Sequence, residues 1–103
     1  MENSKPFLRL QNLLTQGNLW LYILSIIRHG KKAYAYGLPE TMEKEYGFRP
    51  NQVMIYVVLY KLEGEGLISS SMEERRKYYR LTDKGKGALQ SGKKYLASLG
   101  KRL

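Results

Sequence analysis

Residues 51–68 read NQVMIYVVLYKLEGEGLI, and this stretch decides the fold. Pro50 cannot continue an earlier helix, and the Asn51 side chain can accept a hydrogen bond from a free backbone N–H group of a new one. A helix is therefore expected to begin at this point. It should end near Gly64 and Gly66, because glycine readily adopts the left-handed conformation that closes a helix.

This helix is predicted to bury one side and to present one edge to solvent. The side chains of the buried side recur at helical spacing: Ile55, Leu59 and Leu62. The presented edge lies about a quarter-turn away: Gln52, Tyr56 and Tyr60. Residues 67–71 then read as a strand, 72–76 as a polar turn and 77–81 as the returning strand. A presented helix followed by a hairpin with a basic tip is typical of a winged helix.

Further elements are expected on both sides of this unit. The N-terminal segment has apolar residues at helical spacing up to Leu14. Residues 19–28 are apolar nearly all round, so this second helix must be covered on two sides. Residues 33–35 read as a short first strand beside the wing. Thr82 can cap a C-terminal helix that starts at Asp83.

Several sequence elements stand in order at suitable distances: Tyr56, Leu62-Glu63, Gly66-Leu67-Ile68, Lys77-Tyr78-Tyr79-Arg80-Leu81-Thr82 and Lys84-Gly85. Together with residues 14–19 they resemble the PadR-like family of winged-helix transcriptional regulators, over about Leu14 to Leu89. The family usually has a tyrosine where Leu38 stands, and often a serine where Asn51 provides an equivalent cap. The resemblance implies a mainly α fold with a small antiparallel β-hairpin wing, which is a winged helix-turn-helix with flanking N- and C-terminal helices.

One compact domain is expected at this length. Residues 1–82 should form the N-terminal helix and the winged helix-turn-helix DNA-binding domain, and residues 83–103 a C-terminal dimerisation helix. The resemblance is to short members of the family, without a large C-terminal domain. In that family the C-terminal helix pairs subunits, so the resemblance implies a homodimer formed by this helix together with the N-terminal one.

The composition is strongly basic. Eighteen Lys and Arg residues stand against nine Asp and Glu residues, which gives a net charge of +9. Most of the excess lies in residues 67–103, which hold the predicted wing and the last helix. This distribution suits a polyanionic partner such as double-stranded DNA.

Other classes of protein are disfavoured by what the sequence lacks. It has no cysteine, no phosphate-cradling glycine loop, no metal-ligand cluster and no nucleophile beside a base, so we expect no enzyme, no metal site and no cofactor. The apolar run at residues 19–27 is shorter than the ~20 residues that span a bilayer, so no membrane partner is expected. The lack of cysteine fits an intracellular protein, and we expect a cytoplasmic, nucleoid-associated location.

The candidate DNA contacts fall into two groups. The helix at about 51–63 is expected to enter the major groove with a set of five residues: Asn51, Gln52, Val53, Tyr56 and Tyr60. The wing at about 72–77 is expected to contact the backbone or the minor groove through basic residues: Arg75, Arg76, Lys77 and Arg80. Each group also has a plainer interpretation, an ordinary solvated helix and a charged hairpin that discourages edge-to-edge aggregation.

Together with these features, the resemblance implies a sequence-specific transcriptional regulator, a repressor that acts as a homodimer; a two-fold dimer favours a palindromic DNA site. Two alternatives stay open, an architectural DNA-binding protein without sequence preference and a winged helix that binds a protein partner. A small aromatic effector is also left open. Some PadR-like regulators bind such compounds between subunits, and Trp20 occurs here among many tyrosines, although core packing explains the same side chains.

Overall fold

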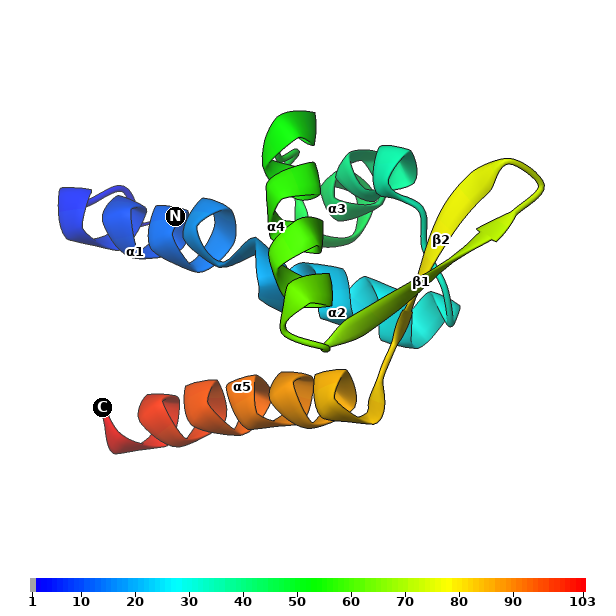
Figure 1. Ribbon diagram of the computed structural model, residues 1–103. Coiled ribbons are helices and arrows are strands. Elements are labelled where there is room, and N and C mark those ends of the chain that lie inside the picture. The colour runs from blue at the N-terminus through cyan, green and yellow to red at the C-terminus, as the bar shows by residue number, and fades with distance from the viewer. Residues whose placement is uncertain (1) are drawn as a thin grey trace.

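In the computed structural model, which describes residues 2–103, a β-hairpin projects from a group of helices (Figure 1). The elements follow in the order α1 (Lys5–Thr15), α2 (Leu19–Gly30), α3 (Leu38–Tyr46), α4 (Gln52–Gly64), β1 (Ile68–Glu73), β2 (Arg76–Leu81) and α5 (Asp83–Arg102). Short 3-10 turns precede α2 and α3: η1 (Gln16–Asn18) and η2 (Ala35–Gly37). The predicted fold class, mainly helical with a two-stranded antiparallel wing, is confirmed.

Local hydrogen bonds set the beginnings of α4 and α5. The Asn51 side chain accepts a hydrogen bond from the Val53 backbone nitrogen at 2.7 Å, as predicted. The hydroxyl oxygen of Thr82 accepts one from the Gly85 nitrogen at 3.0 Å. After α4, Gly66 adopts the left-handed conformation with a φ of 75°, so the chain can turn into β1.

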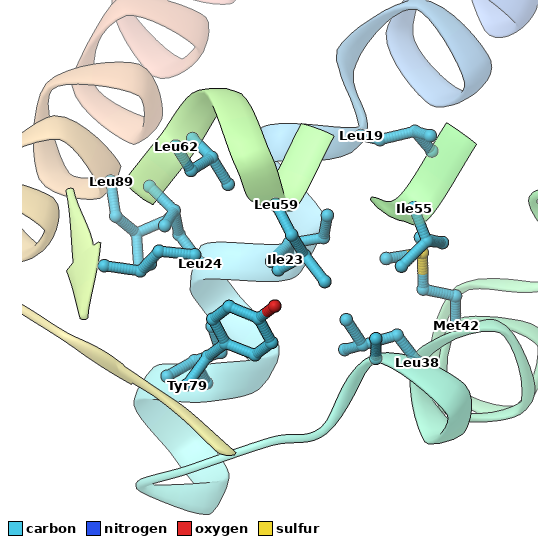
Figure 2. Close-up of a cluster of buried hydrophobic side chains, with 13 residues drawn as sticks. Leu19, Ile23, Leu24, Leu38, Met42, Ile55, Leu59, Leu62, Tyr79 and Leu89 are labelled. Atoms are coloured by element: carbon cyan, nitrogen blue, oxygen red, sulfur yellow. The ribbon is translucent and has the colours of Figure 1, made fainter. Parts of the chain in front are cut away.

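The core lies where α2, α3, α4 and the hairpin meet (Figure 2). The predicted buried stripe of α4 is confirmed, because Ile55, Leu59 and Leu62 are all at most 4% exposed. They pack in one cluster with buried residues of the other elements: Ile23, Leu24, Ile27, Leu38, Met42, Tyr79 and Leu89. One side of α4 is thus fixed against the core, and its opposite side faces solvent.

The hairpin differs from the prediction at its tip. Its register pairs Ile68 with Leu81 at the base and Glu73 with Arg76 at the end, so the turn consists of residues 74–75 alone. The predicted turn at 72–76 was too long. Both turn residues have positive φ angles, 50° and 69°, and a two-residue turn of this kind matches the twist of paired strands. The strands therefore extend nearly to the tip.

The predicted first strand at 33–35 is also corrected. Ala33 forms an isolated bridge with Tyr79, with backbone N–O distances of 3.0 and 2.7 Å in the two directions. Ala35 already belongs to η2, whose 3-10 geometry ends any extended pairing. The segment thus anchors the middle of the wing without forming a full third strand.

The outer ends of α1 and α5 extend from the core in the same general direction, opposite to the wing (Figure 1). Helix α1 has no buried residue. Leu8, Leu10 and Leu13 of α1 are about half exposed, at 47–51%, and Tyr95 of α5 is 63% exposed. Near the core, α5 covers one of the apolar sides of α2, with Gly92 beside Trp20. The prediction that α2 is covered on two sides is therefore confirmed. The core covers one side and α5 covers the other.

Candidate nucleic-acid interface

The solvent-facing side of α4 is apolar. Its exposed residues are Val53, Met54, Tyr56, Val57, Tyr60, Lys61 and Gly64. Tyr56 and Tyr60 were expected on this side, and they are 51% and 81% exposed. Exposure of Met54 and Val57 was not expected. The sequence could have predicted this exposure, because α4 contains more apolar residues than one buried stripe can hold.

Asn51 and Gln52 both have partners within the chain. The Asn51 side chain caps α4, and the Gln52 amide nitrogen donates a hydrogen bond to the Ala35 carbonyl oxygen at 2.9 Å. Gln52 is half-buried. The expectation that Gln52 lies on the presented edge of the helix is therefore corrected. Its side chain joins the start of α4 to η2, and this position leaves its amide nitrogen bonded to protein.

The predicted basic residues do lie on the hairpin, but most of them contact protein groups. The Arg76 guanidinium stands 4.3 Å from the centre of the Tyr34 ring, and the Lys77 ammonium is 3.7 Å from a carboxylate oxygen of Glu63. Arg75 occupies the turn, is exposed, and has no ion pair or side-chain hydrogen bond within residues 2–103. The tip of the wing therefore presents an unpaired guanidinium.

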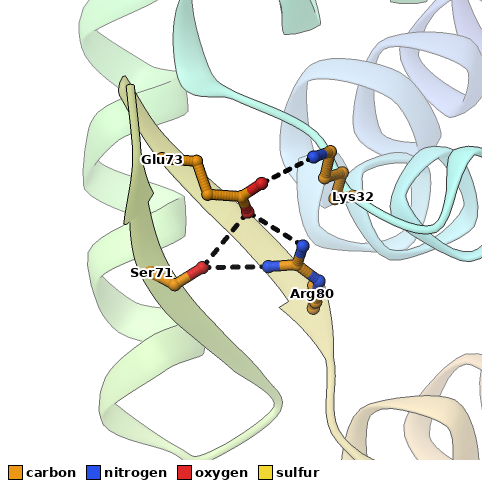
Figure 3. A network of polar contacts seen from close by, with 4 residues as sticks. All are labelled: Lys32, Ser71, Glu73 and Arg80. Carbon is orange, nitrogen blue, oxygen red and sulfur yellow. Dashed lines mark hydrogen bonds and ion pairs between the residues drawn. The ribbon is translucent and has the colours of Figure 1, made fainter. Parts of the chain in front are cut away.

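Arg80 belongs to a polar network that sequence reasoning missed (Figure 3). Glu73 accepts hydrogen bonds from the Lys32 ammonium and from the Arg80 guanidinium, each at 2.8 Å, and Arg80 also donates to the Ser71 hydroxyl at 2.9 Å. The Lys32 hydrogen bond, and next the Arg80 one, hold the pKa of the Glu73 carboxyl below its usual value. Because two cations meet one carboxylate, the network keeps a net positive charge.

A second set of contacts fixes the wing to α4. The Glu63 carboxylate near the end of α4 accepts a hydrogen bond from the Ser70 hydroxyl of β1 and forms the ion pair with Lys77 of β2. Tyr56 lies on the same side of α4 as Glu63, because residues seven apart are two turns apart on a helix. The wing-facing edge of α4 therefore leads from Tyr56 to the strands of the hairpin.

Neither a metal-ligand cluster nor a membrane-spanning helix is seen in residues 2–103. That part of the chain contains no group of three His, Cys, Asp or Glu side chains that could hold a metal ion. None of its helices is both long and apolar enough to cross a bilayer. His29 contacts the Ser25 carbonyl oxygen at 2.8 Å near the end of α2. Trp20 is half-buried, and its indole N–H donates to Asn18, which agrees with core packing.

Comparison with known proteins agrees with this geometry. The family model described as "Transcriptional regulator PadR-like family" matches residues 23–91. A PadR family transcriptional regulator from Eggerthella lenta is 28% identical, with a TM-score of 0.78 over 90% of this chain and 84% of that one. A PadR family transcription regulator from Clostridium difficile is also 28% identical, with a TM-score of 0.72 over 82% and 92%.

A more distant structure shares the fold. A winged-helix DNA-binding protein from STIV is 16% identical, with a TM-score of 0.70 over 80% of this chain and 89% of that one. No curated protein sequence matches the chain. The fold and the family match define the class, a DNA-binding transcriptional regulator. Within that class, the chain belongs to the transcriptional regulator PadR-like family.

Proposed function

We propose that the protein is a transcriptional repressor that binds operator DNA as a homodimer, with α4 in the major groove and the wing on the phosphate backbone or in the minor groove. The observation that carries this proposal is the pairing of two exposed surfaces on one rigid unit. The one carboxylate beside the exposed side of α4, Glu63, is paired with Lys77 of the wing, and the adjoining hairpin ends in an unpaired arginine. A polyanion with a groove wide enough for a helix fits this arrangement.

The contacts are assigned by their position on α4 and the wing. Val53 and Tyr56 lie near the start of α4, the part of a recognition helix that comes closest to base edges. The hydroxyl of Tyr60, one turn further on, suits a phosphate oxygen. Arg75 is the strongest candidate for a backbone contact because its charge is free. Four weaker candidates contact protein groups and would act through a second contact or by shaping the site: Asn51, Arg76, Lys77 and Arg80.

The dimer is proposed from the apolar surfaces at the other end of the molecule. Leu8, Leu10 and Leu13 of α1 and Tyr95 of α5 form exposed apolar surface that a second copy would cover. Residues 83–103 then serve as the dimerisation helix of a domain whose DNA-binding part is residues 1–82. A two-fold dimer with its recognition helices about 34 Å apart would bind a palindromic site. Binding across a promoter would block transcription.

The apolar face of α4 is also compatible with two other functions. The apolar face of α4 has few groups that hydrogen-bond bases, which suits an architectural protein that binds DNA without sequence preference. The same face suits a winged helix that binds an apolar surface of another protein. The free charge of Arg75 favours DNA over a protein partner, and the family match favours a regulator over an architectural protein.

Competition binding at matched salt distinguishes these functions. A site selected from genomic DNA should bind about 10³-fold more tightly than a random duplex of the same length. Equal affinities would indicate an architectural protein, and no binding at low salt would contradict DNA binding altogether.

A variant of the wing tip tests the backbone contact. Arg75→Ala should reduce the salt slope of binding by about 0.9 for each phosphate that the arginine neutralises, because fewer counterions are then released on binding. Arg102→Ala, at the end of α5 away from the wing, is the matched control and should leave the slope unchanged. Equal slopes for the wild-type protein and Arg75→Ala would contradict a phosphate contact at the tip.

A further inference from the structure

Over its first two turns, the exposed face of α4 lacks the side chains that usually recognise base edges by hydrogen bonding. Arg or Lys makes the bidentate contact to guanine, and Asn or Gln makes the one to adenine. The only basic residue of α4, Lys61, lies near its end. Helix α4 contains no arginine, and Gln52 at its first position uses its amide nitrogen on the Ala35 carbonyl. Asn51, just before α4, uses its side-chain oxygen as the helix cap. At the start of α4, sequence preference must therefore come from another kind of contact.

Apolar side chains occupy the exposed positions where hydrogen-bonding residues would contact bases. Val53, Val57 and Tyr60 follow one another at i, i+4 and i+7, so they lie in one line along the exposed side of α4. Val53 is 67% exposed and lies in the first turn of the helix. Val57 is 38% exposed, one turn further along. Their methyl groups form the surface that enters the groove if α4 is the recognition helix.

The charge around this apolar line argues against an ordinary apolar partner. Lys61 is the one charged residue on the exposed side of α4, which is described along its whole length. The nearest carboxylate on α4, Glu63, is bonded to Ser70 and Lys77 of the wing. The whole chain carries a net charge of +9. The partner that complements both features is a polyanion that displays apolar groups. In the major groove of DNA, the apolar group available is the C5-methyl of thymine.

We propose that α4 recognises thymine 5-methyl groups through Val53 and Val57, so that the preferred DNA sites carry A·T pairs under each recognition helix. This inference rests on the proposed function, because it requires α4 to enter the major groove. The inference names the chemical group that α4 contacts in the major groove. The tyrosine hydroxyls and the wing hold the helix against the backbone, and contact with the valines distinguishes thymine from cytosine and from the purines.

Deoxyuridine tests the inference because it keeps the hydrogen-bonding groups of thymine and lacks only the methyl. A duplex selected by the protein from a random pool should be compared with the same duplex synthesised with deoxyuridine at thymine positions. Removal of each contacted methyl should weaken binding about fourfold, the effect of removing one buried methyl group. In a palindromic site with one such methyl per half-site, binding then weakens about 15-fold. Deoxyuridine outside the protected region should change nothing.

A variant ties the effect to α4. The double variant Val53→Ala and Val57→Ala keeps good helix formers at two exposed positions, so folding should be preserved. Its affinities for the thymine and deoxyuridine duplexes should become equal. Leu103→Ala removes an exposed apolar side chain beyond α5 and should keep the wild-type ratio.

The possible results distinguish a failure of methyl recognition from a failure of DNA binding. Equal binding of the two duplexes by the wild-type protein, or an unchanged ratio in the valine variant, would overturn methyl recognition by α4 and leave DNA binding intact. Failure to bind any duplex would overturn both.

Discussion

Single glycine residues decide how closely α5 approaches the rest of the fold. At Gly85, a Cβ atom would overlap the carbonyl oxygen of Leu67, an approach that no real Cβ makes. At Gly87, in the same helix, nothing lies within 4 Å of the corresponding position. Two glycines that look alike in the sequence therefore have opposite effects, one permitting close packing and the other weakening the helix.

We expect Gly85→Ala and Gly87→Ala to change stability in opposite directions. The first should lower the free energy of unfolding by about 1–3 kcal/mol or prevent folding, because backbone must move to admit the methyl group. The second should raise it by about 0.5–1 kcal/mol, because alanine favours the helix over the unfolded chain. Urea unfolding followed by circular dichroism measures both. Similar effects of the two substitutions would contradict the packing described here.

Contacts between neighbouring residues were predictable from the sequence, and contacts between distant residues were not. The caps at Asn51 and Thr82 bond to groups two or three residues away, so their local pattern is sufficient. The Gln52 contact joins residues 17 apart in sequence, and η2 supplies its acceptor. Nothing near Gln52 in the sequence distinguishes an inward-facing amide from one that faces DNA.

Among the elements, ion pairs hold the wing to two other segments, the loop after α2 and helix α4. Lys32 in the loop after α2 bonds to Glu73 of β1, and Arg80 of β2 bonds to the same carboxylate. At the other edge, Glu63 of α4 pairs with Lys77. These contacts join segments up to 41 residues apart, so sequence spacing did not reveal them. The returning strand was predictable because more buried and more exposed side chains alternate over residues 79–81. The turn was predicted too long because residues 74–75 adopt positive φ angles without glycine.

The Glu73 network predicts an acid-sensitive wing. The pKa of this carboxyl is lowered, so its stabilisation is complete above the ordinary glutamate pKa of about 4.3 and is lost as the pH falls through the lowered value. Hydrogen-exchange protection factors of the hairpin amides, which correct for the intrinsic pH dependence of exchange, should therefore fall on acidification in that range.

Two variants test the source of this effect. Glu73→Gln removes the titrating group and should give hairpin protection that no longer depends on pH in this window. Glu45→Gln, at an exposed position of α3 outside the network, should keep the wild-type profile. A wild-type hairpin whose protection is constant down to strongly acidic pH would show that the network contributes nothing.

In the whole molecule, the surfaces proposed for dimerisation and for DNA binding lie at different places along its length. The outer parts of α1 and α5 lie at one end, the wing lies at the other, and α4 stands between them (Figure 1). The order of the helices and the wing was predictable because capping residues, glycines and prolines mark where the elements begin and end. The exposure of α1 and of the outer part of α5 was not predictable, because their apolar residues look like core residues in the sequence.

The exposed apolar surface of α1 predicts self-association. Leu10→Lys together with Leu13→Lys should shift the protein from dimer to monomer at micromolar concentration, because two buried charges would replace apolar contacts. Sedimentation velocity measures the change. Val57→Lys, an equally polar substitution on exposed α4, is the control and should leave the dimer intact. A monomeric wild-type protein at these concentrations would contradict the dimer.

If the exposed side of α4 and the tip of the wing together bind duplex DNA, addition of a duplex at low salt should change the NMR amide chemical shifts of these two surfaces. The largest changes should fall at Val53, Tyr56, Val57 and Tyr60 of α4 and at Arg75 of the wing, with little change in the outer half of α5. Changes confined to α1 and α5, or no change at any residue, would contradict DNA binding by α4 and the wing.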